Sequence, residues 1–437
     1  MHLLSKNEGR MHTMCKKRKK GLGLFLSVLM TTAFLSGCGS TAEDGVTEIH
    51  IVQYKMEAVS FFEQLEEEFN KTHNDIKLTI ESPNDAMTIL KTRFVREDYP
   101  DIIGIGGDVN YSYFVDSNIL LDVSDYQGLN DIKTSYIDML EGLEFVPTEG
   151  TFGVPYVANA AGVLYNKDLF EEHNWQIPTT WSEFISLCEM IQAEGIQPLY
   201  FGYRDTWTCL APWNALAVGL TDADICAQVN KGEATFEDAY GKVAEKMIEM
   251  MQYGVAGPFA YNYNDACIAF ANGDAAMYTI GSYAVPQIQS VNPNINIDSF
   301  VMPANEDASM NVLNSGIDLQ FCLTKGCKDK EAAYEVLDFL LEHGNMQAYL
   351  DNQNAVPCKE ETFELASMLD GMATYIEEGK MSDFHDHHYP SEMAVDGMIQ
   401  TYLMEGDKEA FLAKFDKDWL RYNRDIIRKV ESYEAGR

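Results

Sequence analysis

Basic residues are scarce in this sequence. It holds 32 Lys and Arg against 68 Asp and Glu, a formal charge of −36 over 437 residues. The residues before Cys38 contain seven of the basic residues and one acidic residue, so the remainder is still more acidic. A strongly negative surface repels the phosphates of nucleic acid and anionic lipid headgroups. The composition therefore excludes nucleic acid as a partner.

A disulfide framework is missing too. Beyond Cys38 the sequence has seven cysteines, an odd number without the short, regular spacing of a disulfide-rich scaffold. Most have apolar neighbours in the sequence, as in "SLCEMI" and "QFCLT", which predicts small buried side chains. Cys322 and Cys327 have no second pair at metal-ligand spacing, so a zinc site there is not favoured. Free thiols on an exported chain would indicate a reducing habitat.

No hydrophobic run is long enough for a comfortable membrane span. The run at 21–35 is shorter than the roughly 20 residues that a spanning helix needs, and the basic run 16–20 precedes it. This order of basic run, apolar run and small residues is typical of a secretory signal over residues 1–37. The unusual residues before Lys16 leave open whether translation begins at Met1, Met11 or Met14.

The signal ends in "LSGC", which resembles the lipobox of bacterial lipoproteins. The resemblance implies that Cys38 is acylated and becomes the first mature residue, with residues 38–46 as a tether. The protein would then be lipid-anchored on the outer face of the cell membrane of a Gram-positive bacterium. The alternative is an ordinary signal peptide followed by a free cysteine.

Common catalytic motifs are absent: the sequence contains no nucleophile elbow, phosphate loop or zincin signature. The sequence therefore predicts a protein that is not an enzyme and needs no cofactor. A glycoside-active enzyme stays the main rival, because paired carboxylates and aromatics also surround a sugar in glycosidases. A structural or adhesive surface protein is the second rival.

From residue 47 the chain alternates strand-like and helix-like patterns. "TEIHIVQY", "IKLTIES" and "DIIGIG" have the apolar character of strands, and "AVSFFEQLEEEFNKTH" places apolar side chains on one helical stripe. This alternation predicts an α/β fold with a mostly parallel sheet, in two lobes because about 400 residues exceed one core. Ligands of such sheets lie beyond the carboxyl ends of the strands, which points to the loops 53–57, 82–85 and 106–113.

The second half is mainly helical. Thr180 and Glu183 have the spacing of a capping box, and Gly195 is placed to end that helix. A helical region follows over 212–220, 234–254 and into the stretch 263–285. A turn at "NG" then precedes a short strand, "AAMYTI".

Several blocks of the sequence together resemble a known family. They are "FNKTHNDIKLTI", "YPDII", "TFGVPYVANAAGVLYNKDLFEEHNWQIPTTWSEFISLCEMIQAEGIQPL", "FANGDAAMYTIGSYA" and "DKEAAYEVLDFLLEH". In this order they are similar to family 1 extracellular solute-binding proteins, the group of maltose-binding protein. The resemblance covers most of the chain from residue 47 to about residue 357.

The resemblance implies a two-lobed periplasmic-binding-protein fold of type II, with the ligand cleft between hinge-connected lobes. The expected N-terminal lobe is 47–157 and 316–352, and the C-terminal lobe is 158–315 and 353–437. The implied function is capture of a sugar, an oligosaccharide by expectation, and its delivery to the permease subunits of an ABC transporter. The protein would act as a monomer. A non-sugar solute is the alternative ligand, and the sequence names neither the sugar nor the permease.

The segment "GVPYVANAAGVLYNKDLF" contains tyrosines and asparagines within an apolar run, and buried polar groups need partners. By the resemblance, residues 155–161 form the first crossing between the lobes. Tyr156 and Asn159 are then expected to face the cleft. Tyr165 and Asn166 are assigned to packing and helix capping instead.

Sugar sites combine flat aromatic platforms with planar polar groups. Trp207 and Trp213 follow a strand end, and Tyr283 occupies the place where relatives often carry an aromatic contact. Trp213 shares a helical stripe with Leu216 and Leu220, so packing explains it, and Trp207 and Tyr283 are the expected platforms.

Polar candidates come from three loops: Tyr54 after the first strand, Asp108 after "DIIGIGG", and Asp318 at a second crossing between the lobes. The alternative for the first two is a solvated loop. The cluster "FHDHHYP" contains His385, His387 and His388, which zinc could use, but adjacent histidines in a loop do not all point inward. We expect no metal there, and a surface loop or a single side chain that reaches the cleft.

Overall fold

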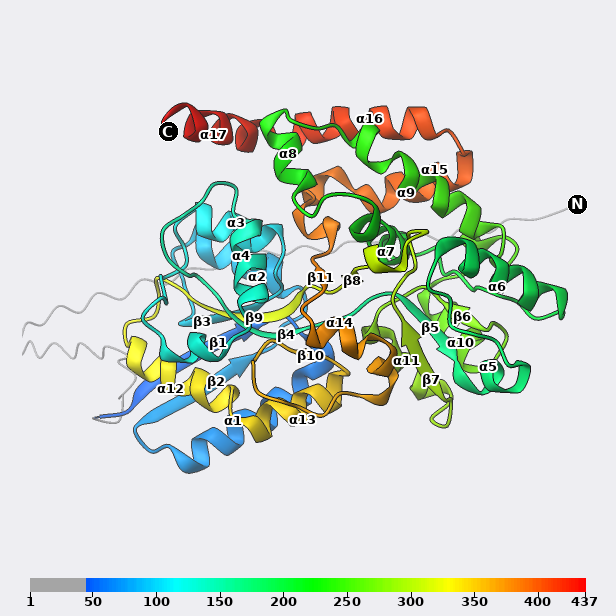
Figure 1. Ribbon diagram of the computed structural model, residues 1–437. Coiled ribbons are helices and arrows are strands. Elements are labelled where there is room, and N and C mark those ends of the chain that lie inside the picture. Colours follow the sequence, from blue (N-terminus) through cyan, green and yellow to red (C-terminus); the bar gives the residue numbers. More distant parts are fainter. Residues whose placement is uncertain (1–44) are drawn as a thin grey trace, which may run out of the picture. The chain divides into compact units, whose positions relative to one another are not determined.

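The computed structural model describes residues 45–437, so the predicted signal and Cys38 lie outside the described residues. Within this range the chain forms a six-stranded sheet, a three-stranded sheet and a two-stranded sheet (Figure 1). The two larger sheets come from different stretches of the chain and carry their own helices. The predicted α/β architecture with two lobes is therefore confirmed.

The six-stranded sheet has the order β10-β4-β9-β3-β1-β2. Its strands are β1 (Thr47–Gln53), β2 (Ile76–Glu81), β3 (Ile102–Ile105), β4 (Val154–Ala158), β9 (Ile317–Leu323) and β10 (Val356–Pro357). The first three pair in parallel, but β9 is antiparallel to β3 and β4, and β10 is antiparallel to β4. The expectation of a mostly parallel sheet is thus wrong. The reason is that β9 returns from the other lobe, so no βαβ crossover fixes its direction. β10 belongs to this sheet although it follows residue 352.

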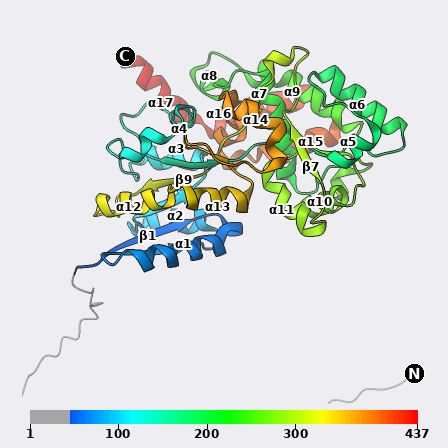
Figure 2. The same cartoon turned by 60° about the horizontal axis from the view of Figure 1, so that its bottom comes forward.

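Helices cover the six-stranded sheet. They are α1 (Val59–Thr72), α2 (Ala86–Val95), α3 (Val109–Asp116), α4 (Thr134–Leu143), α12 (Lys330–Leu340) and α13 (His343–Gln353). Figure 2 shows α12 and α13 beside α1, where Phe69 meets Phe339 and Phe61 meets Tyr349 with ring centroids 5.2 and 5.3 Å apart. The predicted apolar stripe of α1 is confirmed, because Phe62, Leu65 and Phe69 are buried.

The three-stranded sheet has the order β6-β5-β7, with β5 (Val163–Asn166) antiparallel to β6 (Met277–Tyr278) and β7 (Ile297–Phe300). Its helices are α5 (Lys167–His173), α6 (Trp181–Ala193), α7 (Leu210–Leu220), α8 (Ile225–Lys231), α9 (Phe236–Met251), α10 (Tyr263–Ala271) and α11 (Val285–Val291). The predicted capping box of α6 is present between Thr180 and Glu183, and Gly195 adopts a positive φ just beyond the helix. Asn166 caps α5, and Tyr165 packs on Phe170, as expected.

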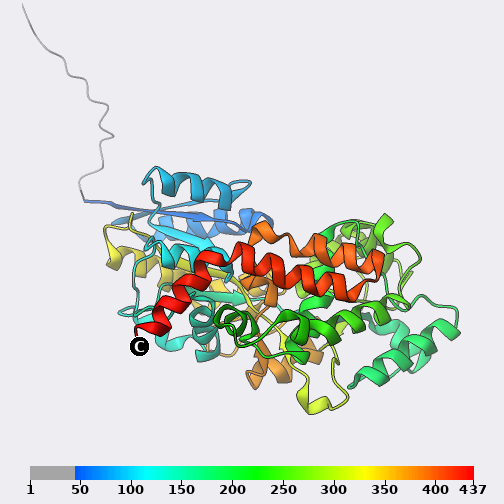
Figure 3. The same cartoon turned by 90° about the horizontal axis from the view of Figure 1, so that it is seen from above.

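The tail is helical and joins the second lobe. It contains α14 (Ala373–Glu377), α15 (Val395–Glu405), α16 (Lys408–Tyr422) and α17 (Arg424–Ala435). Figure 3 shows α15 and α16 side by side, where Tyr402 stacks on Phe411 at 4.7 Å. No helix of residues 45–437 is long and apolar enough to cross a bilayer.

Two segments that connect the sheets lie side by side. They are 158–162 after β4 and the segment around β8 (Leu313–Asn314) before β9. β11 (Met381–Ser382), which follows α14, pairs with β8. The amides of Asn159 and Ala161 donate to the carbonyls of Gly316 and Asn314, at 3.1 and 2.8 Å. Gly316 is needed here, because a Cβ would lie 2.1 Å from a carboxylate oxygen of Asp383.

The cysteines behave as the sequence predicts. All seven that the structure describes are free and buried. Burial raises the pKa of Cys226 and Cys322 above the ordinary value, so these thiols stay protonated. They are packing residues.

Candidate functional site

A cavity of about 520 Å³ lies where the first lobe, the connecting segments and the second lobe meet. Its lining includes Lys55, Glu57, Asn159, Tyr263, Tyr283 and Asp318. Cavities of this size, lined by aromatics with a few convergent polar groups, are typical of small-molecule sites. Another hollow of about 560 Å³ lies beside α4 and α14, but none of the predicted site residues lines it.

The loop after β1 enters this cavity in a fixed conformation. Gln53 is fully buried, and its side-chain amide binds the carbonyl of Lys55 and the hydroxyl of Ser82. These bonds tie two of the predicted loops together beyond the carboxyl ends of β1 and β2. Of the three predicted loops, 53–57 lines the cavity through Lys55 and Glu57, and no residue of 82–85 or 106–113 is among the lining residues.

Lys55 forms two ion pairs in the cavity wall. Its Nζ lies 2.6 Å from Glu57 and 2.8 Å from Asp318, and only 6% of the residue is exposed. Burial alone would lower the pKa of Lys55, but Asp318 and Glu57 outweigh burial and the pKa rises above its ordinary value. The ammonium is therefore charged. The predicted residue Asp318 lines the cavity and orients Lys55.

Tyr54 and Asp108 do not line the cavity themselves. The hydroxyl of Tyr54 donates to the backbone carbonyl of Asp318. Asp108 is the N-cap of α3 and accepts a 2.8 Å bond from the amide of Asn110, while the amide of Gly107 donates to Ile317 at the start of β9. Neither residue is among those that line the cavity. Their visible roles are to hold Asp318 and to begin α3.

Asn159 lies on the first connecting segment, as the resemblance implied. Its backbone amide donates to the carbonyl of Gly316, and its backbone carbonyl accepts from the hydroxyl of Ser315. These two bonds fix the backbone at this position. Its side chain lines the cavity, and its Oδ1 is buried without a hydrogen-bond partner among residues 45–437. A buried unpaired oxygen is costly unless something fills the site, so Asn159 is suited to bind a hydroxyl or amide of a ligand.

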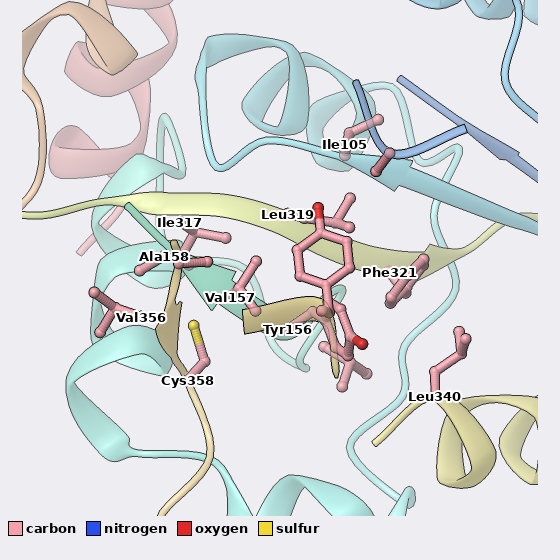
Figure 4. Close-up of a cluster of buried hydrophobic side chains, with 14 of the residues drawn as sticks. Ile105, Tyr156, Val157, Ala158, Ile317, Leu319, Phe321, Leu340, Val356 and Cys358 are labelled. Atoms are coloured by element: carbon pink, nitrogen blue, oxygen red, sulfur yellow. The ribbon is translucent and has the colours of Figure 1, made fainter. Parts of the chain in front are cut away.

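Tyr156 does not line the cavity, and the expectation that it faces the cleft is wrong. It is 0% exposed, and its ring centroid lies 5.3 Å from that of Phe321, on the neighbouring strand (Figure 4). The ring of Tyr349 lies 5.2 Å away. All five residues of β4 are buried, because this strand is covered on both faces. Tyr156 therefore belongs to the core of the six-stranded sheet.

Three aromatic rings form a cluster, which we call the cleft aromatics: Trp207, Tyr263 and Tyr283. Tyr263 and Tyr283 line the cavity, whereas the predicted platform Trp207 is not among the lining residues. The Trp207 ring is 5.0 Å from Tyr263 and 6.2 Å from Tyr283, and 40% of Trp207 is exposed. Gly281 makes room for Tyr283, since a Cβ there would lie 2.3 Å from its ring. Tyr263 is not among the predicted site residues, because its place at the start of α10 gives it no unusual local pattern.

Trp213 lies in the core of the second lobe, as predicted. It is 0% exposed, donates from Nε1 to the Tyr389 hydroxyl at 3.2 Å, and meets Tyr240 edge-to-face at 5.2 Å. Tyr240 in turn bonds to Tyr389 at 2.8 Å and to a ring nitrogen of His385 at 2.9 Å. We call Trp213, Tyr240 and Tyr389 the core aromatics.

The histidine cluster is not a surface loop, which corrects that expectation. It forms a short 3-10 helix, η8 (His385–His388), and His385 is 1% exposed. Burial, and then His388, lower the pKa of His385 to about 3. Burial opposes the charge of His387, but Asp383, 2.7 Å away, outweighs it and raises the pKa of His387 to about 9.

Asp386, on the same helix, accepts a 2.8 Å bond from the side-chain amide of Asn214 and is not among the residues that line the cavity. Burial, and then the charge of Asp386, raise the pKa of Tyr283. Among residues 45–437, no three His, Cys, Asp or Glu side chains are grouped so as to hold a metal ion.

Comparisons with known proteins agree with this geometry. A family model described as bacterial extracellular solute-binding protein matches residues 55–347. The multiple sugar-binding protein of Streptococcus mutans is 26% identical over 76% of this chain and 81% of its own length. The diacetylchitobiose binding protein of Streptomyces coelicolor is 28% identical over 28% of this chain and 26% of its own length.

Solved structures show the same fold. A raffinose complex of the binding protein RafE, a protein also solved in apo form from Streptococcus pneumoniae, has a TM-score of 0.73 at 23% identity. That match covers 87% of this chain and 100% of the other. A stachyose complex of a Bacillus licheniformis sugar transporter has a TM-score of 0.68 at 18% identity, and covers 86% and 100%. At these sequence identities, the structural similarity supports a shared fold only.

Proposed function

Because this chain belongs to the bacterial extracellular solute-binding protein family, we propose that it captures an oligosaccharide and delivers it to an ABC transporter permease. The observation that carries this proposal is the cavity at the meeting of the lobes. Tyr263 and Tyr283 offer flat faces to the C–H groups of a sugar ring, and the unpaired oxygen of Asn159 offers an acceptor for a hydroxyl. The raffinose, stachyose and diacetylchitobiose named for similar proteins give the first ligands to try.

A thermal-shift screen tests the proposal, followed by calorimetry on each hit. Raffinose, stachyose, N,N′-diacetylchitobiose and maltotriose form the panel. A ligand that binds only the native state raises the free energy of unfolding, by about 2.7 kcal/mol at a hundred times its Kd, and the melting temperature rises with it. If no sugar changes the melting temperature, the ligand class is wrong. Released reducing ends in the same mixtures would instead reveal a glycoside-active enzyme, which this proposal excludes.

Capture involves closure of the two lobes around the sugar. The two adjacent connecting segments, 158–162 and the segment around β8 with β11 paired to it, are the natural hinge. A ligand drives closure only through its preference for the closed form. Small-angle scattering should show a smaller radius of gyration at saturating ligand. The scattering mass should be that of a monomer with and without the ligand. An unchanged radius would count against this mechanism.

Lipid anchoring through Cys38 completes the proposed function and places the protein on the outer face of the cell membrane. It rests on the sequence "LSGC" after an apolar run. Replacing Cys38 with Ser should release the protein into the medium or leave it unprocessed. Retention and processing of C38S like those of the unaltered protein would contradict the anchor.

A further inference from the structure

The cavity between the lobes has one closed end, which we call the inner end. Asn159 and Ser282 line it, and both are tied to the connecting segments. The amide of Ser282 donates to the carbonyl of Ala160 at 2.8 Å, and the amide of Asn159 donates to the carbonyl of Gly316 at 3.1 Å. Ser282 is only 2% exposed. Backbone hydrogen bonds therefore seal the cavity here.

The first lobe closes the inner end from the other side. Asp318 lines the cavity, and its carboxylate lies 2.8 Å from the ammonium of Lys55, which also lines it. The hydroxyl of Tyr54 donates to the backbone carbonyl of Asp318 and holds this wall in place. The Asp318 carboxylate and the unpaired Oδ1 of Asn159 give the inner end oxygen acceptors for the hydroxyls of a sugar ring.

The other end of the same cavity is open. We call it the mouth, and its residues are Pro286, Gln287, Asn352 and Gln353. The first two come from α11 of the second lobe, and the last two end α13 of the first lobe. Pro286 and Asn352 are exposed, and both glutamines are half-buried. The two lobes thus supply opposite edges of an opening to solvent.

One short stretch of chain lines the cavity from the inner end to the mouth. Residues 282–287 run from buried Ser282 through half-buried Tyr283 to exposed Pro286, and all three line the cavity. The ring of Tyr283 therefore lies in the part of the wall that joins the two ends. A sugar ring on this tyrosine can reach the buried acceptors on one side and the amides of the mouth on the other.

The amides of the mouth have hydrogen-bonding groups to spare. Within residues 45–437 the side chain of Gln287 makes no hydrogen bond, and that of Gln353 bonds only to Asn352, at 2.6 Å. A side-chain amide has two N–H donors and a carbonyl acceptor, and a sugar hydroxyl can both donate and accept. The mouth is therefore suited to bind further rings of a sugar chain.

We propose that this cavity binds the end of an oligosaccharide, with the terminal ring at the inner end and the following rings leaving through the mouth. The inference rests on the proposed function, since it states which part of a sugar chain the same cavity binds. The buried acceptors and the tyrosine rings hold the terminal ring. Gln287 and Gln353 bind the next rings, so that affinity depends on chain length.

A chain-length series tests the role of the mouth. Sucrose, raffinose and stachyose form one series, and maltose, maltotriose and maltotetraose form another. In the series that binds, calorimetry of the double variant Q287A/Q353A should show a loss of about tenfold in affinity for the longer sugars and little loss for the disaccharide.

A matched control keeps this result specific. Q176A/Q192A removes two exposed glutamines that do not line the cavity, and it should bind every sugar like the unaltered protein. Equal losses at all chain lengths in Q287A/Q353A, or no loss at any length, would overturn the inference and leave the proposed function intact.

A bulky tag tests the difference between the two ends. Two derivatives of the tightest-binding sugar are compared, each with fluorescein on one of its two terminal rings. Only one of them should bind, because only the mouth has room for the dye. Binding of both derivatives would show a groove open at both ends, and binding of neither would show a closed pocket. Either result would overturn the inference.

Thiol reactivity tests the shape of the cavity without any sugar. S282C places a cysteine at the inner end and Q287C places one at the mouth, in a chain from Gly45 whose seven native cysteines are buried. A dye maleimide should react at least about tenfold more slowly with S282C than with Q287C. Equal rates would overturn the inference, whereas failure of every sugar to bind counts against the proposed function instead.

Discussion

The core aromatics and the cleft aromatics each take one tryptophan from the short stretch 207–213 but differ in how their polar atoms are used. Trp213 is fully buried and Trp207, six positions earlier, is 40% exposed. In the core, indole, phenol and imidazole form a continuous hydrogen-bonded chain. At the cleft, three tilted rings leave part of their surface to solvent. Burial with polar partners serves stability, whereas a held but uncovered ring is available to a ligand.

The largest expected effect comes from the core aromatics. Trp213→Ala should lower the free energy of unfolding by about 3 to 5 kcal/mol, because it opens a cavity and leaves the Tyr389 hydroxyl short of a partner. Urea denaturation without ligand measures this. A variant with unchanged stability and lost affinity would show that the two clusters have been assigned the wrong way round.

Tyr283→Ala should affect binding instead. Loss of one stacking platform weakens sugar binding by about 1 to 3 kcal/mol, a factor of about 5 to 150 in Kd. Calorimetry with a sugar that passes the screen gives the affinity, and the ligand-free melting temperature should stay near that of the unaltered protein. Tyr375→Ala is a control, since this half-buried tyrosine lies outside the cavity lining and should keep full affinity.

Trp207→Ala should weaken binding in the same direction but less, toward the lower end of that range, because Trp207 is at the edge of the cluster. The ligand-free melting temperature should again change little. A loss larger than that of Tyr283→Ala would make Trp207 the main platform.

The smallest effects separate two buried tyrosine hydroxyls. Tyr240→Phe removes bonds to His385 and Tyr389 and should cost about 1 kcal/mol or more, since it leaves polar atoms unpaired. Tyr156→Phe removes a buried hydroxyl that has no partner among residues 45–437 and should be neutral or stabilising. Equal losses in the two variants, measured by urea denaturation, would break the comparison.

The sequence predicts local features of this fold well. The α6 capping box, the apolar face of α1 and the packing of Trp213 all follow from spacing along one element. The expectation that Tyr156 faces the cleft follows from the resemblance, which implies that residues 155–161 form a crossing between the lobes. β4 continues to Ala158 and is buried on both faces, so Tyr156 still lies within the sheet, whereas Asn159 lies just beyond it.

The remaining misses come from contacts between distant elements. Tyr263 begins α10 with no unusual local pattern, and only the fold brings its ring to Trp207. The "HDHH" segment looked exposed because it is polar. Its burial depends on Tyr240 and Asn214, more than 140 residues away, which supply the hydrogen bonds that make burial affordable.

The seven buried thiols make the described part of the chain suitable for site-specific labelling. A chain that starts at Gly45 presents no exposed cysteine, so a maleimide dye would attach only where a new cysteine is introduced. One dye on exposed Glu63 of α1 and one on exposed Glu237 of α9, each changed to Cys, would report the distance between the lobes. Single-molecule energy transfer on such a molecule would measure the rates of the proposed opening and closing. The native cysteines could stay in place, because they are buried and would not react with the dye.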